Sequence, residues 1–204
     1  MSLSDRSVPR QLDVVARIEP FEPFALSDAP DGILAGRAAD GDARAFEVLV
    51  RRYGPLMRAY ATRMLGGTSE SDDIVQESFI AAWEQLPTLR DGNAARSWLM
   101  RITGRKAIDR IRSRKNDEPL HDWDAEAPAR DSPVHRVEVA SQRERLTEAL
   151  AGLTPEQRQS WLLREVGGYS YEEIGEQLGI APSTVRGLLA RARRKLVEEM
   201  EDWR

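Results

Sequence analysis

The chain has 204 residues, of which 41% are hydrophobic and 31% charged, and its formal net charge is −4. It contains no cysteine, which excludes disulfides and thiolate metal sites, and two histidines do not make a zinc site alone. No apolar run is long enough to span a bilayer, and the N-terminus lacks the pattern of a signal peptide. We therefore expect one or two domains that need no metal, no cofactor and no direct insertion into a membrane.

The first thirty residues carry four prolines and no sustained apolar period. We expect residues 1–30 to form a flexible N-terminal extension. From residue 31 onward, apolar side chains recur at the spacing of one helix face. Pro55 marks a helix start or a kink within this stretch, and the pair Gly66-Gly67 marks its end.

Residues 68–86 form the next predicted helix, which Ser69 or Ser71 can cap. One face is apolar, and most of its polar side chains, including Asp72 and Asp73, lie outside that face. Paired carboxylates also bind magnesium, so a carboxylate-dependent nuclease is one interpretation of this face. No histidine or further acid cluster stands at a matching spacing, which favours a solvated or protein-docking surface.

A loop at residues 87–96 precedes a strongly basic helix that we expect Ser97 to cap, with Asp109 as its only acid. Cations for the phosphates and an aromatic ring for the bases are what single-stranded nucleic acid requires of a protein. Trp98 lies near the helix start, where a tryptophan is more often a core residue than a base-stacking one, and both roles stay open. The side chains assigned to this basic face are Trp98, Arg101, Arg105, Lys106 and Arg112.

Residues 116–140 combine three prolines with many acids, which predicts an extended, flexible acidic linker. This segment accounts for the negative net charge of a chain that has two basic helices. Thr154 followed by Pro155 is then a strong signal for the start of another helix. We expect an all-α fold of two small helical domains, residues 31–115 and 141–204, joined by this linker.

Residues 170–195 predict two short helices around a tight turn, with Gly179 after the first and Pro182 opening the second. One arc of the second helix is apolar, and the opposite arc is small or cationic. This pattern indicates a helix-turn-helix whose second helix enters the major groove, and a helical hairpin with a solvated basic face is the alternative. The expected DNA-facing residues are Ser183, Thr184, Arg186, Gly187, Arg191 and Arg194.

From residue 31 to 198 the chain resembles the extracytoplasmic-function (group IV) sigma factors of the sigma-70 family of RNA polymerase. The most specific match is the run DDIVQESFIAAW at residues 72–83, which is similar to the family's region 2.2. Residues 96–114 resemble regions 2.3 and 2.4, and residues 153–195 are similar to region 4.

The resemblance implies a non-enzymatic transcription initiation factor in the cytoplasm that binds core RNA polymerase and directs it to promoters. It implies that the second domain reads the −35 element as duplex, while the basic helix opens and captures the −10 element. The implied partners are the β′ coiled coil and the β flap of the polymerase, promoter DNA and an anti-sigma factor. The resemblance assigns core binding to Asp72, Asp73, Gln76 and Glu77, and it puts Arg90 and Asn93 in a loop that takes a flipped base.

The chain departs from the family in the second helix of the helix-turn-helix. Members often carry Gly-Thr-Val-Lys-Ser-Arg where this chain has Ser-Thr-Val-Arg-Gly-Leu at residues 183–188. Compared with those members, Gly187 replaces a serine and so lacks its hydroxyl, and Leu188 replaces an arginine and so lacks its positive charge. We therefore expect this chain to prefer a different −35 sequence. The alternative function is a two-module DNA-binding regulator that acts without polymerase. Substitutions at Gln76 and Glu77 distinguish these two functions, because they should abolish transcription only if the chain is a sigma factor.

Overall fold

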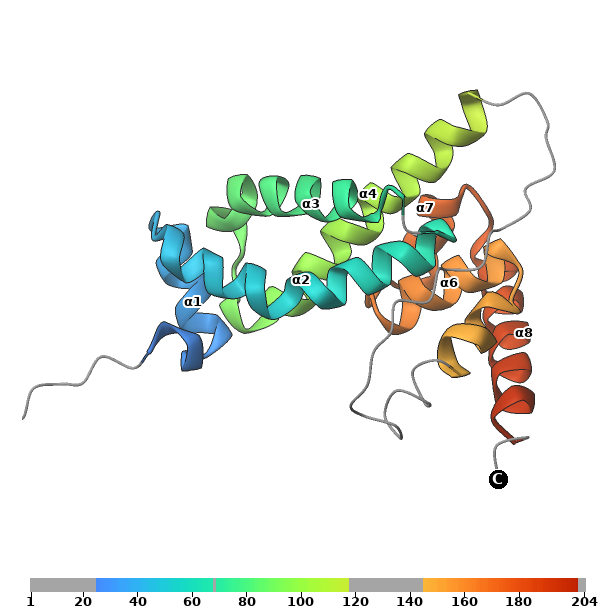
Figure 1. The fold of residues 1–204 in the computed structure, drawn as a ribbon. Helices are drawn as coiled ribbons and strands as arrows, with labels where there is room; N and C mark the ends of the chain where they lie inside the picture. The colour runs from blue at the N-terminus through green and yellow to red at the C-terminus, as the bar shows by residue number, and fades with distance from the viewer. Residues whose placement is uncertain (1–24, 68, 118–144, 202–204) are drawn as a thin grey trace, which may run out of the picture.

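The structure, a computed structural model, describes residues 25–67, 69–117 and 145–201, which form helices and turns without a β-strand (Figure 1). The first domain contains α1 (Asp31–Ala39), α2 (Ala43–Leu65), α3 (Ser71–Gln85) and α4 (Ala95–Asp117), with 3-10 turns at Leu26–Asp28, Leu86–Thr88 and Gly92–Ala94. The second contains helical residues 145–151, α6 (Pro155–Glu165), α7 (Tyr171–Leu178) and α8 (Pro182–Glu201). The predicted all-α class with two helical domains is confirmed. Most of the predicted N-terminal extension, and nearly all of the predicted linker, lies outside the described residues.

Helix α2 runs without interruption through Pro55, where the sequence predicts a helix start or a kink. Proline removes one backbone donor, which leaves the carbonyl of Arg51 without its helical partner. Both residues are exposed, so water can solvate this turn and the helix continues. At the N-terminus Asp42 caps α2 by accepting a bond from the Ala45 amide (3.3 Å), and Gly66 ends the helix with φ +75°, as predicted.

The predicted serine cap of α3 is wrong. Ser71 is the first helical residue, and the N-cap is Glu70, whose side chain makes no capping bond. Its carboxylate instead pairs with two arginines of α4, Arg110 (Nη1–Oε1 3.3 Å) and Arg114. The acid at the start of α3 therefore joins two helices of the first domain instead of capping its own.

The predicted start of α4 is also wrong, because a helix capped by Ser97 would begin at Trp98, whereas α4 begins three residues earlier, at Ala95. Asp91 accepts a hydrogen bond from the Asn93 amide (2.9 Å) and opens a 3-10 turn, which runs directly into the helix at Ala95. Ser97 therefore lies inside the first helical turn, where its hydroxyl donates to the Ala94 carbonyl (3.0 Å). The cap was assigned to the wrong residue because the turn before it already has helical geometry.

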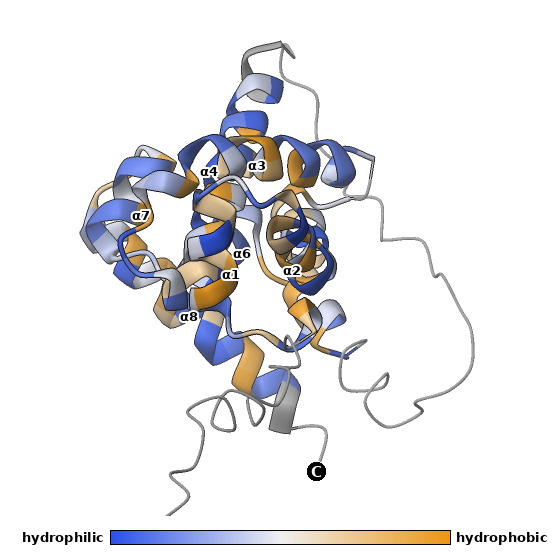
Figure 2. Ribbon diagram, turned by 90° about the vertical axis from the view of Figure 1, so that its left-hand side faces the viewer, coloured by the Kyte–Doolittle hydropathy of each residue, from blue (hydrophilic) through white to orange (hydrophobic). Residues whose placement is uncertain are grey.

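Two clusters of buried apolar residues form the core of the described structure. The smaller one lies between α1, α2 and the turn after α3, and includes Leu34 and Leu86. The larger one is continuous from Met57 of α2 to Leu163 of α6 and Ile174 of α7. The two domains therefore pack against each other, through α2 with α6 and α4 with α7. Figure 2 shows hydrophilic residues on the outward turns and hydrophobic ones between neighbouring helices.

The helix-turn-helix forms where the sequence predicts it. Ser170 and Glu173 cap α7 reciprocally, and Gly179 ends it in the left-handed region with φ +68°. The turn is tight because the Ile180 amide donates to the carbonyl of Gly175 (2.9 Å). A Cβ on Gly175 would lie 2.7 Å from the Ile180 oxygen, so this position has no room for a side chain.

A methyl group added at either turn glycine should destabilise the second domain. Gly179→Ala forces a side chain into the left-handed region, at a cost of about 1–2 kcal/mol. Gly175→Ala should also destabilise, since the clash with Ile180 outweighs a helix-propensity gain of about 1 kcal/mol.

Gly36 of α1 supplies a matched control, because a Cβ there meets no atom within 4 Å. Gly36→Ala should stabilise the chain by about 0.5–1 kcal/mol in denaturant unfolding. A Gly175→Ala protein that unfolds like Gly36→Ala would contradict the close approach in the turn.

Candidate functional site

An apolar groove of about 980 Å³ runs between α2 and α3. Its aromatic floor is built on Phe46, whose ring meets those of Phe79 (6.1 Å between centroids) and Trp83 (5.0 Å) edge-on. Ile80 and Trp83 are large apolar side chains that stay 54% and 37% exposed. We did not assign these two residues to the site from the sequence, although Ile80 lies off the apolar stripe of its helix and could have signalled an exposed contact.

The four residues predicted to bind core polymerase do not share one face. Asp72 and Gln76 line the groove, where Asp72 pairs with Arg58 of α2 (2.8 Å). Asp73 is exposed. Glu77 turns away toward α4 and pairs with Arg110 (3.1 Å) and Lys106 (3.6 Å).

No group of three or more acidic or histidine side chains that could hold a metal ion occurs within the described part of the chain. None of the helices described there has the length and the apolar character needed to cross a membrane.

The residues predicted to capture single-stranded DNA lie along α4 but differ in their surroundings. Arg105 is exposed, and Lys106 is half-buried beside Glu77. Trp98 is also half-buried and packs against both apolar clusters, so one part of its ring belongs to the core. Arg101 and Arg112, in contrast, face the second domain.

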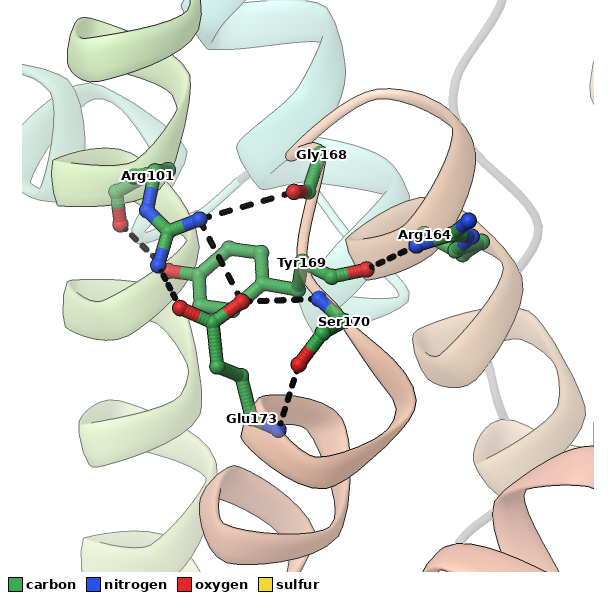
Figure 3. Close-up of polar contacts among 6 residues, drawn as sticks. All are labelled: Arg101, Arg164, Gly168, Tyr169, Ser170 and Glu173. Carbon is green, nitrogen blue, oxygen red and sulfur yellow. Dashed lines mark hydrogen bonds and ion pairs between the residues drawn. The ribbon is translucent and has the colours of Figure 1, made fainter.

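Arg101 is held by the start of α7 (Figure 3). Its guanidinium pairs with the carboxylate of Glu173 (Nη1–Oε2 3.4 Å) and lies 4.5 Å from the centre of the Tyr169 ring. The Tyr169 hydroxyl donates to the carbonyl of Arg101 (2.6 Å). The bond from Arg101 lowers the pKa of Glu173, and burial raises the pKa of Tyr169. Glu173 therefore stays ionised at neutral pH.

Arg112 contacts the other end of α7. Its Nη2 donates to the backbone carbonyls of Glu176 (3.2 Å) and Gln177. Carbonyls in the last turn of a helix lack intrahelical partners and carry the negative end of its dipole. Arg101 and Arg112 thus bind opposite ends of one short helix.

The predicted base-flipping loop is ordered against α1. Arg90 and Asn93 are both exposed, and the Asn93 amide group donates to Asp91 (3.1 Å). Gly92 lies against Gly32 so closely that a Cβ on it would be 2.9 Å from the Gly32 backbone. The loop is therefore a fixed platform next to the start of α4.

Helix α8 separates its two faces as predicted. Val185, Leu189 and Ala192 are fully buried against the second domain. The predicted DNA-facing residues Ser183, Thr184, Arg186, Arg191 and Arg194 are exposed, and Gly187 is half-buried among them. The remaining arginine, Arg193, points back to α6 and pairs with Glu165 (3.0 Å). The exposed face presents cations and hydroxyls on one rigid helix.

A helix-turn-helix domain with an exposed basic face, packed on a helical domain with a second basic helix, defines a class of two-domain helical DNA-binding proteins. Comparison with known proteins narrows this class. The family model for sigma-70 region 2 matches residues 49–116, and the model for sigma-70 region 4 matches residues 143–196.

The chain is 36% identical over 176 residues to the RNA polymerase sigma factor CnrH of Cupriavidus metallidurans, with 81% of this chain and 92% of that protein covered. It is 32% identical to the ECF RNA polymerase sigma factor SigE of Mycolicibacterium smegmatis, with 83% and 68% covered. Its fold is similar to that of the sigma factor RpoE of Bartonella quintana, solved in complex with the anti-sigma factor NepR. The TM-score is 0.50 at 24% identity, with 76% of this chain and 96% of that chain covered.

The chain therefore belongs to the sigma-70 family of RNA polymerase sigma factors, in its extracytoplasmic-function group. It is a transcription initiation factor that binds core RNA polymerase and directs it to promoters. The family resemblance stated from the sequence is confirmed, and a regulator that acts without polymerase is not favoured.

Proposed function

We propose that the groove between α2 and α3 binds core polymerase, and that α4 and α8 bind the two promoter elements. The observation that supports this most strongly is that one chain presents an open apolar groove and two cationic helices on different faces. A partner helix, such as the β′ coiled coil, would cover Ile80 and Trp83 and reach the polar rim at Asp72 and Gln76. The exposed Asp73 extends this rim, while Glu77 contributes by fixing α3 to α4.

In this proposal α4 captures the non-template strand of the −10 element. Arg105 and Lys106 contact phosphates, and the exposed part of the Trp98 ring stacks on a base. Arg90 and Asn93 flank a base that leaves the stack, since both are exposed on the loop before α4. The guanidinium groups of Arg101 and Arg112 can contact DNA only when they leave their partners on α7. No covalent step is involved, because the melted strand is stabilised by binding alone.

The second domain fixes the register on the −35 duplex. Arg186 and Arg191 reach base edges or phosphates in the major groove from the exposed face of α8, and Arg194 adds a phosphate contact. Contact with the β flap would hold this domain on the polymerase. A shared attachment raises the effective concentration of each DNA contact, which compensates for the weak DNA binding expected of a chain with net charge −4.

A substitution at Gly187 tests how closely the backbone of α8 approaches DNA. A Cβ there meets only the Arg191 guanidinium, at 3.5 Å, so alanine fits the free chain. Gly187→Ala should stabilise α8 by up to about 1 kcal/mol. If the backbone lies against the duplex, the same change should weaken binding to −35 duplex DNA about tenfold in an anisotropy titration. Unchanged affinity would show that close approach is not the reason for this glycine.

An anti-sigma factor is the regulatory partner that we propose, because the RpoE protein of similar fold was solved with one. Such a partner would act by covering the groove or the DNA-binding helices. All of these partners meet the chain in the cytoplasm, where polymerase and promoter DNA are located.

A direct binding measurement tests the central interaction of this proposal. Fluorescently labelled chain titrated with purified bacterial core polymerase should form a one-to-one complex with submicromolar affinity. A chain that stays unbound at micromolar core, while remaining folded by circular dichroism, would refute the groove assignment and leave the DNA contacts to be tested alone.

A further inference from the structure

Tyr171 contacts arginines from two neighbouring helices of the second domain. It is the first residue of α7, and its half-buried side chain packs against the larger apolar cluster. The Cζ atoms of Arg164 and Arg186 lie 5.1 Å and 5.9 Å from the centre of its ring. Both distances are within about 6 Å, the range in which the face of an aromatic ring attracts a cation. One ring therefore contacts both a cation of α6 and a cation of α8.

Two other arginines beside this ring are held by groups of the second domain. Arg164 donates from its Nη1 to the carbonyl of Tyr169 (2.8 Å, Figure 3). Arg193 pairs with Glu165 (3.0 Å). The Glu165 carboxylate and the Tyr171 hydroxyl both raise the pKa of Arg193. The ring is thus held by the apolar cluster and by cations whose own positions are fixed.

Arg186 differs from these two arginines, because no carboxylate of the described residues pairs with it. It is exposed near the start of α8, and within the described part of the chain its guanidinium contacts the Tyr171 ring. An arginine without any contact samples many rotamers, and ordering such a side chain at an interface lowers the affinity by about 2- to 10-fold. A ring contact that exists before DNA arrives removes part of that cost.

We propose that Tyr171 is a positioning residue for Arg186, whose guanidinium its ring holds in the orientation that contacts the −35 duplex. The proposal rests on the assignment of Arg186 to the −35 element. Tyr171 itself does not bind DNA in this account and acts through Arg186 alone. Arg191 lies further along the same exposed face, and no aromatic ring among the described residues contacts its guanidinium. The DNA contact of Arg191 should therefore be independent of Tyr171.

A double-mutant cycle separates this role from a general loss of structure. Tyr171→Leu removes the aromatic face and keeps an apolar side chain against the cluster, so it should weaken duplex binding by about 2- to 10-fold. In an Arg186→Ala background the same change should have no further effect. In an Arg191→Ala background it should lower the affinity by the full factor, because Tyr171 and Arg191 share no contact among the described residues.

The cycle is measured with full-length proteins and a fluorescein-labelled duplex that the wild-type chain selects from a randomised pool. Fluorescence anisotropy gives the affinity of each variant, and circular dichroism at the same temperature verifies that it is folded. Tyr171→Met replaces the leucine variant if leucine lowers the helical signal. Tyr171→Phe is the conservative variant, because it keeps the ring against the apolar cluster and Arg164, and it should bind like the wild type.

Three results would overturn the proposal, and they are distinguishable. Equal losses for Tyr171→Leu in the Arg186→Ala and Arg191→Ala backgrounds would show that the ring does not act through Arg186. A loss in Tyr171→Phe as large as in Tyr171→Leu would show that the hydroxyl acts in place of the ring. An Arg186→Ala chain that binds the duplex like the wild type would refute the assignment of Arg186 to the −35 element, and the proposal with it.

Discussion

Ile80→Asp is expected to abolish polymerase-dependent transcription while leaving the fold intact. Ile80 projects from α3 into the apolar groove and is 54% exposed, so the free chain loses little when the side chain changes. In the complex, the variant forfeits about 1.5–3 kcal/mol of apolar burial and must also desolvate a carboxylate. We expect core affinity to fall more than about 100-fold, measured by titration of the labelled chain with core polymerase.

The control for this variant is Ile33→Asp. Ile33 lies on α1, outside the groove, and is 55% exposed, so the two substitutions make the same chemical change at equal exposure. Ile33→Asp should bind core polymerase like the wild type. Gln76→Ala, at the polar rim of the groove, should weaken binding by a smaller factor. Equal losses at Ile33 and Ile80 would indicate a general effect of charge and would contradict the groove as the docking site.

The second large effect is expected on DNA binding when arginines of α8 are replaced. Arg186→Ala and Arg191→Ala should each weaken binding to promoter −35 duplex by about 10- to 100-fold, since a specific arginine contact contributes about 1–3 kcal/mol. A contact to phosphate should also lower the slope of log affinity against log salt by about 0.9. Anisotropy titrations at several salt concentrations measure both quantities.

Arg193→Ala on the same helix provides the comparison. Arg193 points to α6 and pairs with Glu165 across a partly exposed contact, so its loss should cost at most about 1 kcal/mol of stability. Its duplex affinity and salt slope should equal those of the wild type. A salt slope that falls as much for Arg193→Ala as for Arg191→Ala would mean that net charge, and not the exposed face of α8, governs binding.

The second domain was predictable from the sequence because its signals are local. The Thr154–Pro155 start, the left-handed Gly179 and the helix-opening Pro182 each act within a few residues of where they stand. The two faces of α8 followed from helical periodicity. Gly175 was missed, because its constraint is a contact with the Ile180 carbonyl across the turn, which no propensity reports.

Contacts between distant elements were not predictable in the same way. Arg101 and Glu173 are 72 residues apart, and nothing local indicates that α7 lies against α4. Glu77 was expected on one core-binding surface with Asp72 and Asp73, yet it turns to Arg110 and Lys106 of α4. Periodicity identifies the face of a helix that is polar, but not the element that covers it. For this reason the sequence did not reveal that some of the predicted core-binding residues line the groove while Glu77 contacts α4.

In vitro transcription on a promoter library is the measurement that tests the account most directly. Purified chain, core polymerase and DNA templates with randomised −35 and −10 segments are combined, and RNA 5′ ends are mapped. The account predicts discrete start sites whose templates share two motifs at a fixed spacing, none of which appears with core polymerase alone or with Ile80→Asp. Start sites identical to those of core polymerase alone, in a reaction where the chain is bound to the enzyme, would contradict it.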